Sequence, residues 1–297
     1  MFFFFFFFFF RFLSQPSCSA MKYLDPNPLV EVRNVTEQLK KEFLAEGLTW
    51  GAPVFLREFK FKSFGAYLQR QQRIKTSTEE FAKCYYTNEK GWRYRQPCDW
   101  MDKKLYLEVE RAEPNDPVLE LWVKKGDRYV KFRSYKVCAL SGSLGAKIMQ
   151  GDEMAPEGVF RVSPKAFTAY YLALTVNYPS EFDVKTNPRP NRGGDVLIHG
   201  RCASIGCTAI SGQIPEVYSI VKALGAPAPF HVFPFPMTQE NIDQAVATPE
   251  FSKWKNFWQT LKPVHDDFEE TNKLRTITVE RSNAVPSYNG YRFKIAN

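Results

Sequence analysis

The sequence lacks most of the patterns that mark a familiar catalytic class. It has no P-loop, no G-x-G-x-x-G turn and no paired serine or carboxylate motif. Its six cysteines are too few for a disulfide scaffold, and no apolar run approaches the roughly twenty residues of a membrane helix. Only three histidines are present. The choice of a catalytic base is therefore narrow.

The charge balance favours an acidic partner without pointing to nucleic acid. The net charge is +8 and the pI is about 9.1, which suits an anionic polymer, an anionic lipid or a nucleic acid. No segment has the dense Lys and Arg clustering of a nucleic-acid-binding arm, and the basic residues are scattered among acidic ones. We therefore expect a solvated charged surface and no nucleic-acid partner.

The first twenty residues resemble a crude export signal. Phe2 to Phe10 supply an apolar segment, and Cys18 to Ala20 puts small residues where a signal peptidase cuts. No basic residue precedes the run, and Arg11 interrupts it. We expect a periplasmic or cell-envelope protein if this segment is a signal, and a cytoplasmic protein if translation starts at Met21.

Hydrophobic periodicity predicts an α+β fold that is rich in β-strands and has helices near both ends. Helices are expected at 31–46, 214–224, 238–247 and, interrupted at Pro263, 249–271. Strands are expected at 54–56, 118–123, 128–137, 158–162, 195–198, 230–235, 276–280 and 291–295. The chain is expected to begin with a possible signal at 1–20. An N-terminal segment at 21–59 follows, with a linker at 21–30 and then a helix and the first strand. The remaining segments are an insertion at 60–117, a catalytic core at 118–245 and a C-terminal helical and strand extension at 246–297.

The stretch from 196 to 209 carries the chemistry. An apolar strand leads into His199, and a short loop with glycines at its start and end returns Cys207 to the same neighbourhood. A thiol is mostly protonated at neutral pH, and an imidazole beside it can take its proton. Gly206 lets the backbone approach closely, and the amides after Cys207 can donate to a developing oxyanion. This pattern predicts Cys207 as a nucleophile and His199 as its base.

Two other interpretations of these residues stay open at this point. A cysteine in an apolar setting is usually a small core residue. His199, Cys202 and Cys207 could instead be zinc ligands, but no fourth ligand stands at metal spacing, and His231 and His265 lie in unrelated contexts. We therefore expect neither a metal nor a cofactor.

The same stretch resembles a known active-site signature. His199-Gly200 followed by Ser204-Ile205-Gly206-Cys207 resembles that of the YkuD-type L,D-transpeptidase family, and is closest to its YafK-like branch, where the intervening loop is short. The wider family has a second histidine where this chain has Ile205, and the arginine that often follows the cysteine is missing. The resemblance runs from residue 31 to the end, the insertion excepted, through stretches such as 151–160, 177–183 and 231–237.

The resemblance implies a β-sandwich-like L,D-transpeptidase catalytic domain with flanking helices and an inserted subdomain. It implies attack on the amide carbonyl of diaminopimelate in peptidoglycan stem peptides, through a thioester on Cys207. In this branch it implies hydrolysis that releases a Braun-type lipoprotein. The Gly200 carbonyl is expected to orient the imidazole, and the residues expected to contact substrate are Tyr178, Arg201, Ser204, Gly206 and Thr208.

Three alternatives to hydrolysis are kept. The enzyme could be a transpeptidase that forms such links, or the chain could be a non-catalytic wall-binding module. It could also be an unrelated cytoplasmic thiol protein. Nothing in the sequence indicates an oligomeric state.

The remaining cysteines and the insertion give two further expectations. In an oxidising compartment Cys84 is expected to pair with Cys98, and Cys138 with Cys202; in the cytoplasm all four are expected to be thiols. The insertion at 60–117 is crowded with aromatic and basic residues. It is expected either to form a lid beside the cleft, with Trp92 and Trp100 near Cys207, or to pack far from the site.

Overall fold

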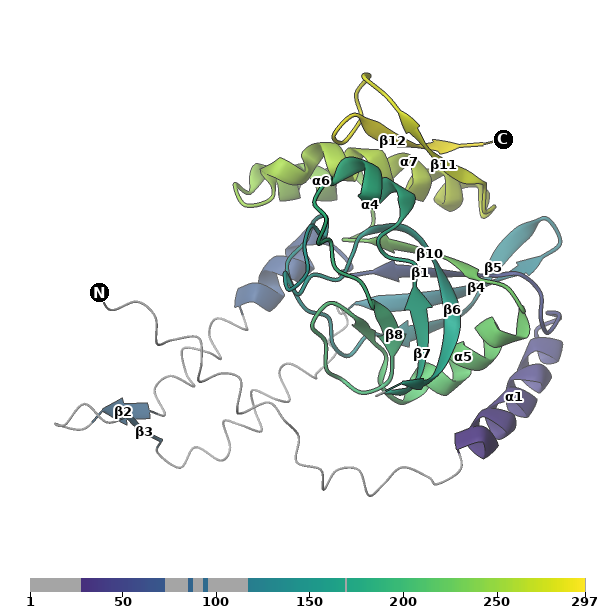
Figure 1. Cartoon of the computed structure of the whole chain (residues 1–297). Coiled ribbons are helices and arrows are strands. Elements are labelled where there is room, and N and C mark those ends of the chain that lie inside the picture. The colour runs from purple at the N-terminus through teal and green to yellow at the C-terminus, as the bar shows by residue number, and fades with distance from the viewer. Residues whose placement is uncertain (1–27, 73–84, 88–92, 96–116, 169, 297) are drawn as a thin grey trace.

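The computed structural model describes residues 28–72, 85–87, 93–95, 117–168 and 170–296 (Figure 1). Its centre is one eight-stranded mixed sheet with the strand order β5-β4-β1-β10-β6-β7-β8-β9. In chain order these strands are β1 (Val54–Phe59), β4 (Val118–Lys125), β5 (Arg128–Lys136), β6 (Gly158–Thr168), β7 (Tyr171–Val176), β8 (Leu197–His199), β9 (Thr208–Ala209) and β10 (Ala228–Phe233).

Helices cover the sheet from both sides (Figure 1). One group is α1 (Pro28–Ala45) and α5 (Ile214–Ala223). The other is α4 (Glu181–Thr186), α6 (Gln239–Ala247), the 3-10 turn η3 (Ser252–Trp254) and α7 (Lys255–Thr271), together with the hairpin β11 (Ile277–Arg281) and β12 (Tyr291–Ile295). A 3-10 turn, η2 (Ser211–Gln213), precedes α5, and a short hairpin, β2 (Tyr85–Thr87) with β3 (Arg93–Arg95), lies in the insertion.

Alternating residues of the central strands feed two separate apolar cores, because successive side chains of a strand point to opposite faces. On β1, Val54 and Leu56 join the core that α1 and α5 close. Phe55 packs instead with Phe268 of α7, and Phe59 joins the aromatic core around α6 and α7. Both faces of β1 are therefore buried, which fits the burial of all six of its residues at the middle of the sheet.

The sheet curls until its two edges meet. Residues just after β5, at one edge, form a bridge from Ala139 to Ala209 of β9, at the other edge. The amide of Cys138 donates to the carbonyl of Ala209 over 2.8 Å, and the amide of Ala209 donates to Ala139 over 3.2 Å. This closure turns a single sheet into the sandwich-like body that the family resemblance implied, and the α+β expectation is confirmed.

Most of the expected elements are present, and the differences have physical causes. The segment 249–271 is not interrupted, because α7 runs straight through Pro263, and buried residues before and after it hold the helix on the sheet. The expected strand at 158–162 extends to Thr168 and pairs with β7. Strand β7 was not predicted, because its sequence has no clear alternation of apolar and polar residues. The linker expected at 21–30 overlaps α1, which begins at Pro28, and proline is well tolerated at the start of a helix.

The expected segment boundaries do not follow the packing. β1 was assigned to an N-terminal segment, yet it lies between β4 and β10 at the centre of the sheet. The boundary at 245 falls inside α6. The start of the insertion is part of the aromatic core, since Phe61, Phe64 and Tyr67 are buried there. Trp92 and Trp100 lie outside the described residues, so the lid remains a prediction.

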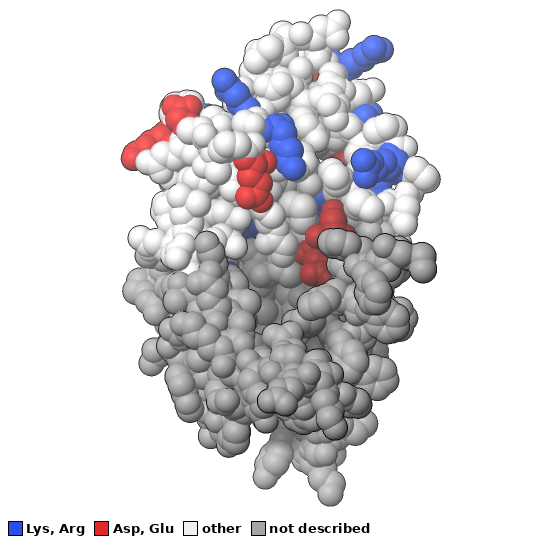
Figure 2. Space-filling view, turned by 90° about the vertical axis from the view of Figure 1, so that its left-hand side faces the viewer, with Lys and Arg blue, Asp and Glu red and all other residues white. Residues whose placement is uncertain are grey.

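The described surface carries charges of both signs. Figure 2 shows Lys and Arg side chains and Asp and Glu side chains interspersed on the side of the molecule that lies at the left of Figure 1. Among the helices of the described residues, none combines the length and the apolar character needed to cross a bilayer.

Candidate active site

The parallel pairing of β8 with β9 brings the predicted base and nucleophile to one face of the sheet. Ile198 is in register with Thr208, and His199 with Ala209. Residues in register share a face, and so do residues two apart on a strand, so Cys207 lies on the same face as His199. One strand spacing and a two-residue offset separate their Cα atoms by roughly 8 Å. A histidine and a cysteine side chain can span that separation.

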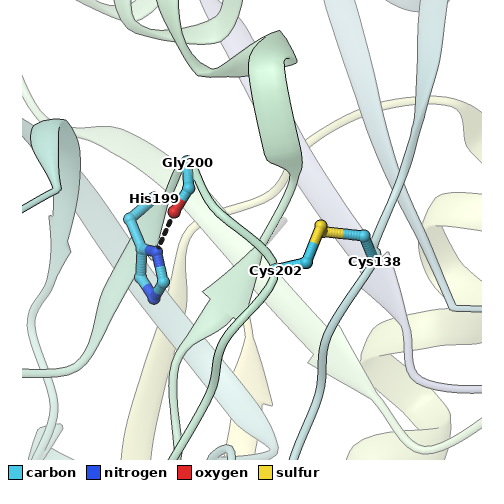
Figure 3. The surroundings of a disulfide bond; sticks show 4 residues. All are labelled: Cys138, His199, Gly200 and Cys202. Atoms are coloured by element: carbon cyan, nitrogen blue, oxygen red, sulfur yellow. Dashed lines mark hydrogen bonds between the residues drawn. A yellow bond between two sulfur atoms is a disulfide. The ribbon is translucent and has the colours of Figure 1, made fainter. Parts of the chain in front are cut away.

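His199 is completely buried, and its orientation is fixed by its neighbour. Its Nδ1 lies within hydrogen-bonding distance of the Gly200 carbonyl (Figure 3). A carbonyl can only accept, so Nδ1 carries the proton and Nε2 is the basic nitrogen. Nε2 is buried and has no hydrogen-bond partner within the described part of the chain. The expectation that Gly200 orients the imidazole therefore agrees with the geometry, and the unpartnered Nε2 is free to accept a proton.

An aromatic ring lies flat against the imidazole. The ring of Tyr170, from the turn between β6 and β7, stacks on His199 with centroids 3.7 Å apart and an interplanar angle of 18°. This ring helps to shield the imidazole from water. Burial lowers the pKa of His199; the bond to Gly200 opposes that shift, and the nearby Arg201 adds to it. The imidazole is thus kept neutral, as a base must be.

The Cys207 thiol is partly buried at the same face. Its Sγ lies 3.9 Å from the carbonyl oxygen of Asp195. Burial raises the pKa of Cys207, whereas the amide of Leu197 and the ammonium group of Lys147 lower it and the carboxylate of Asp195 raises it. The resting pair is therefore a neutral thiol beside a neutral imidazole.

The loop between base and nucleophile is braced by its own hydroxyl groups. Ser204 Oγ donates to the Cys207 carbonyl over 2.6 Å and accepts the amide of Gly206 over 3.2 Å. It also lies 3.1 Å from the hydroxyl of Ser141. Gly206 has φ of +124°, and a Cβ there would meet the carbonyl oxygen of Met154 at 3.2 Å, so only glycine fits without strain. Ser204 and Gly206 thus shape the turn that presents the thiol.

Thr208 points the other way. Its side chain is buried on the core side, and its hydroxyl donates to Glu58 over 2.7 Å. Any contact of Thr208 with substrate is therefore limited to its backbone. The amide of Ala209 donates to the carbonyl of Ala139. Among the amides after Cys207, that of Ala209 is consequently not available to an oxyanion.

Two other expected substrate contacts have different settings. Tyr178 is buried, and its hydroxyl lies 3.2 Å from the carbonyl oxygen of Lys147 and 3.1 Å from that of Arg192. It ties together two of the loops around the site. Arg201 is exposed and has a positive φ of 64°. The roles of both residues in substrate binding remain predictions.

A disulfide joins the active-site loop to the seam of the sheet. Cys138 and Cys202 are bonded, with their Cα atoms 5.4 Å apart, so this expected pair is confirmed (Figure 3). Cys84 and Cys98 lie outside the described residues. A zinc site on His199, Cys202 and Cys207 would need a free Cys202 thiolate, which the disulfide removes. Within the described part of the chain no three His, Cys, Asp or Glu side chains gather as metal ligands.

Three residues of this region were not singled out from the sequence. Tyr170 covers the base, the Lys147 ammonium lies near the thiol, and Glu58 holds the residue after the nucleophile. Lys147 is itself held by an ion pair with Asp152. The one available signal was Glu58, a carboxylate that stands beside Arg57 in a strand whose other residues are apolar. The other two contacts depend on tertiary placement alone.

The fold is thus a curled mixed sheet with His199 at the end of β8 and Cys207 directly before β9. The chain is 35% identical over 195 residues to the "Putative L,D-transpeptidase YafK" of Escherichia coli K12, covering 63% of this chain and 75% of that protein. The same values hold for the protein of that name in Escherichia coli O157:H7. The chain belongs to the YafK-like L,D-transpeptidase family.

Comparison with solved structures finds more distant likenesses. The helical cell shape determining protein Pgp2 of Campylobacter jejuni is 14% identical, with a TM-score of 0.35, over 55% of this chain and 69% of that one. Bd1075 of Bdellovibrio bacteriovorus is 17% identical, with a TM-score of 0.30, over 56% and 70%. Likenesses of this size do not bear on function. No protein-family model matches the chain.

Proposed function

We propose that this protein is a cysteine hydrolase of peptidoglycan, which cleaves the amide that joins a diaminopimelate carbonyl to a protein or a peptide. The observation that carries the proposal is the pair on one face of the β8–β9 ladder. His199 offers an unpartnered Nε2, fixed by the Gly200 carbonyl, beside the partly buried thiol of Cys207. Membership of the YafK-like family supplies the substrate class.

The first half-reaction uses this pair as nucleophile and base. As the Cys207 sulfur attacks the amide carbonyl, the thiol proton passes to His199 Nε2. A carbon–sulfur bond forms and the carbonyl becomes an oxyanion. The carbon–nitrogen bond then breaks, and the proton on Nε2 passes to the leaving amine. The products of this step are a thioester on Cys207 and a free amine, and His199 is neutral again.

The second half-reaction resolves the thioester. With water as acceptor, His199 removes a proton while the oxygen attacks the thioester carbonyl, and the returning proton restores the Cys207 thiol. The outcome is a free carboxylate at diaminopimelate. With an amine as acceptor, the same steps give a new amide and the enzyme is a transpeptidase. The acceptor alone distinguishes the two activities.

The loop between base and nucleophile favours water. Ile205 stands where the wider family has a histidine, and its side chain is 77% exposed, so it offers an acceptor peptide no hydrogen bond or charge. Water is present at roughly 55 M and needs no anchor, so an amine competes only if the site positions it with a high effective molarity. Hydrolysis is therefore proposed as the main activity, with a Braun-type lipoprotein junction as a candidate substrate.

The proposal places the protein in the periplasm or cell envelope. Peptidoglycan lies there, and the Cys138–Cys202 disulfide supports it, because such bonds persist in oxidising compartments.

A competition assay tests the reaction type. The protein is incubated with stem peptides joined to a lipoprotein peptide, with and without excess D-amino acid, and the products are read by mass. We expect the hydrolysed stem to dominate in both mixtures and no product with Cys207→Ala. Dominant exchange product would make the protein a transpeptidase, and absence of any product would favour a wall-binding role.

A further inference from the structure

Glu58 is a buried carboxyl group at the centre of the sheet. It lies on β1, between β4 and β10, and its side chain is 0% exposed on the core side. Its Oε1 atom has no hydrogen-bond partner among the residues that the structure describes. Burying a carboxyl group in this way is costly, and an apolar residue would fill the position at lower cost. Packing alone therefore does not account for a glutamate here.

The other carboxyl oxygen reaches across the curled sheet to the active-site strand. Thr208 Oγ1 donates to Glu58 Oε2 over 2.7 Å, between residues 150 positions apart in sequence. Thr208 directly follows Cys207, and β9, which begins there, has only two residues. So short a strand has few ladder hydrogen bonds to hold it. The buried side-chain bond to the central strand therefore adds a second restraint on the peptide that follows Cys207, beside the bond from Ser204 to the Cys207 carbonyl.

Burial, more than any neighbouring charge, is what opposes ionisation of the Glu58 carboxyl group. Burial raises the pKa of Glu58 to about 7; the bond from Thr208 and the ammonium group of Lys60 lower it, and the carboxylate of Glu157 raises it. Lys60 is engaged elsewhere, since its Nζ lies 2.6 Å from the carbonyl oxygen of Ala155 and 3.1 Å from Glu157 Oε1. A neutral carboxyl group still accepts the Thr208 hydroxyl, as the amide oxygen of a glutamine would.

We propose that Glu58 is a positioning residue of the active site, which acts through Thr208 to hold the peptide after Cys207 in the orientation needed for attack. The reaction it serves is the proposed hydrolysis, but the geometric coupling to the thiol is independent of the substrate. Glu58 and Thr208 lie on the core side of the sheet, and Cys207 lies on the opposite side with His199.

The test uses the full chain and two readouts. One is the rate at which iodoacetamide alkylates Cys207, followed by peptide mass mapping so that other cysteines do not contribute. The other is kcat and KM on the stem-peptide substrate. The variants are Glu58→Ala, Thr208→Val and their combination, with Glu58→Gln and Thr208→Ser as conservative replacements. Thr260→Val is the matched control, because it removes a buried threonine hydroxyl that bonds only within α7.

Loss of the bond should lower both rates together. We expect Glu58→Ala and Thr208→Val each to reduce the alkylation rate and kcat by about tenfold, the rate equivalent of one lost hydrogen bond, with KM little changed. The double variant should be no slower than the slower single variant. Glu58→Gln and Thr208→Ser should recover most of the loss, and Thr260→Val should react as the wild type does.

Two results would overturn the proposal: additive losses in the double variant, or folded single variants with wild-type rates at Cys207. If Glu58→Ala does not fold, Thr208→Val compared with Thr208→Ser decides the matter, and equal rates in these two count against it. If the wild type cleaves no peptidoglycan but the alkylation pattern holds, the proposed function fails and Glu58 keeps its positioning role.

Discussion

The two faces of the sheet at β8 and β9 differ sharply in chemistry, although neighbouring residues of the same two short segments supply both faces. On the core side, Ile198 packs into apolar core and Thr208 is tied to Glu58. On the other side, His199 and Cys207 carry the groups that can react. Because successive side chains of a strand point to opposite faces, one residue can anchor the backbone while its neighbour carries a reactive group. Changes on either face should therefore affect activity, but in different ways.

Removing the reactive groups should have the largest effect. Cys207→Ala should abolish turnover, because Cys207 is the one free thiol among the described residues. His199→Ala should reduce kcat on the order of a hundredfold to ten-thousandfold, the usual contribution of a positioned general base. Both variants should unfold at temperatures near that of the wild type. Steady-state kinetics on stem peptides with thermal unfolding as the control would check this, and an active Cys207→Ala would refute the assignment.

Removing the disulfide should mainly affect stability. It closes a loop with a sequence separation of 64, and chain entropy predicts a contribution of about 4 kcal/mol for a loop of that length. We expect Cys138→Ser with Cys202→Ser to lower the free energy of unfolding by an amount of that order. Denaturant unfolding measures it. Activity at low temperature should survive, because neither cysteine reacts with substrate, and complete inactivity of a folded double variant would contradict this division of roles.

The stability that Glu58 contributes on the core side should depend on pH. The pKa of Glu58 is about 7 in the folded protein against an ordinary value of 4.5, so the native state holds a proton that the unfolded chain releases. Stability from this group is fully present below pH 4.5 and is lost as the pH rises to about 7. The Glu58→Gln variant should therefore not show this loss of stability as the pH rises. Asp183, whose pKa is raised to about 6, titrates in the same range, so the difference between wild type and variant is the quantity to measure.

On the side that carries His199 and Cys207, Tyr170 should affect the pKa of His199 without being required for turnover. Tyr170→Ala exposes the imidazole to water and removes part of the burial that lowers the pKa of His199. The acidic limb of the kcat/KM profile should then move to higher pH, toward the ordinary value of histidine, while the maximum changes little. Tyr170→Phe keeps the stacked ring and should keep the wild-type limb. Identical limbs in all three proteins would exclude a role for the stack.

The local parts of this arrangement could be predicted from sequence. An apolar run ending in His199 and a short loop to Cys207 indicate a strand and a return, and the helix at 214–224 is clear from its spacing. These features depend on residues close together in the chain. The family resemblance rested on the same stretch, and the 35% identity confirms it.

The parts that could not be predicted depend on distant residues. Tyr170 meets His199 only because β7 pairs with β8, and β7 itself lacked a clear alternation. Glu58 meets Thr208 across 150 residues, once the sheet has curled. Pro263 indicated a helix end, but tertiary packing of α7 outweighed that local preference. Closure of the sheet, rather than any motif, brings these groups to the site.

The proposed mechanism is tested most directly by trapping the thioester intermediate on Cys207. The wild-type protein is incubated with the stem-peptide substrate, quenched in acid, digested and mapped by mass. We expect a thioester adduct on the peptide that contains Cys207. It should be absent from Cys207→Ala and should be lost on treatment with hydroxylamine. Turnover without any adduct at Cys207, or an adduct at another cysteine, would contradict it.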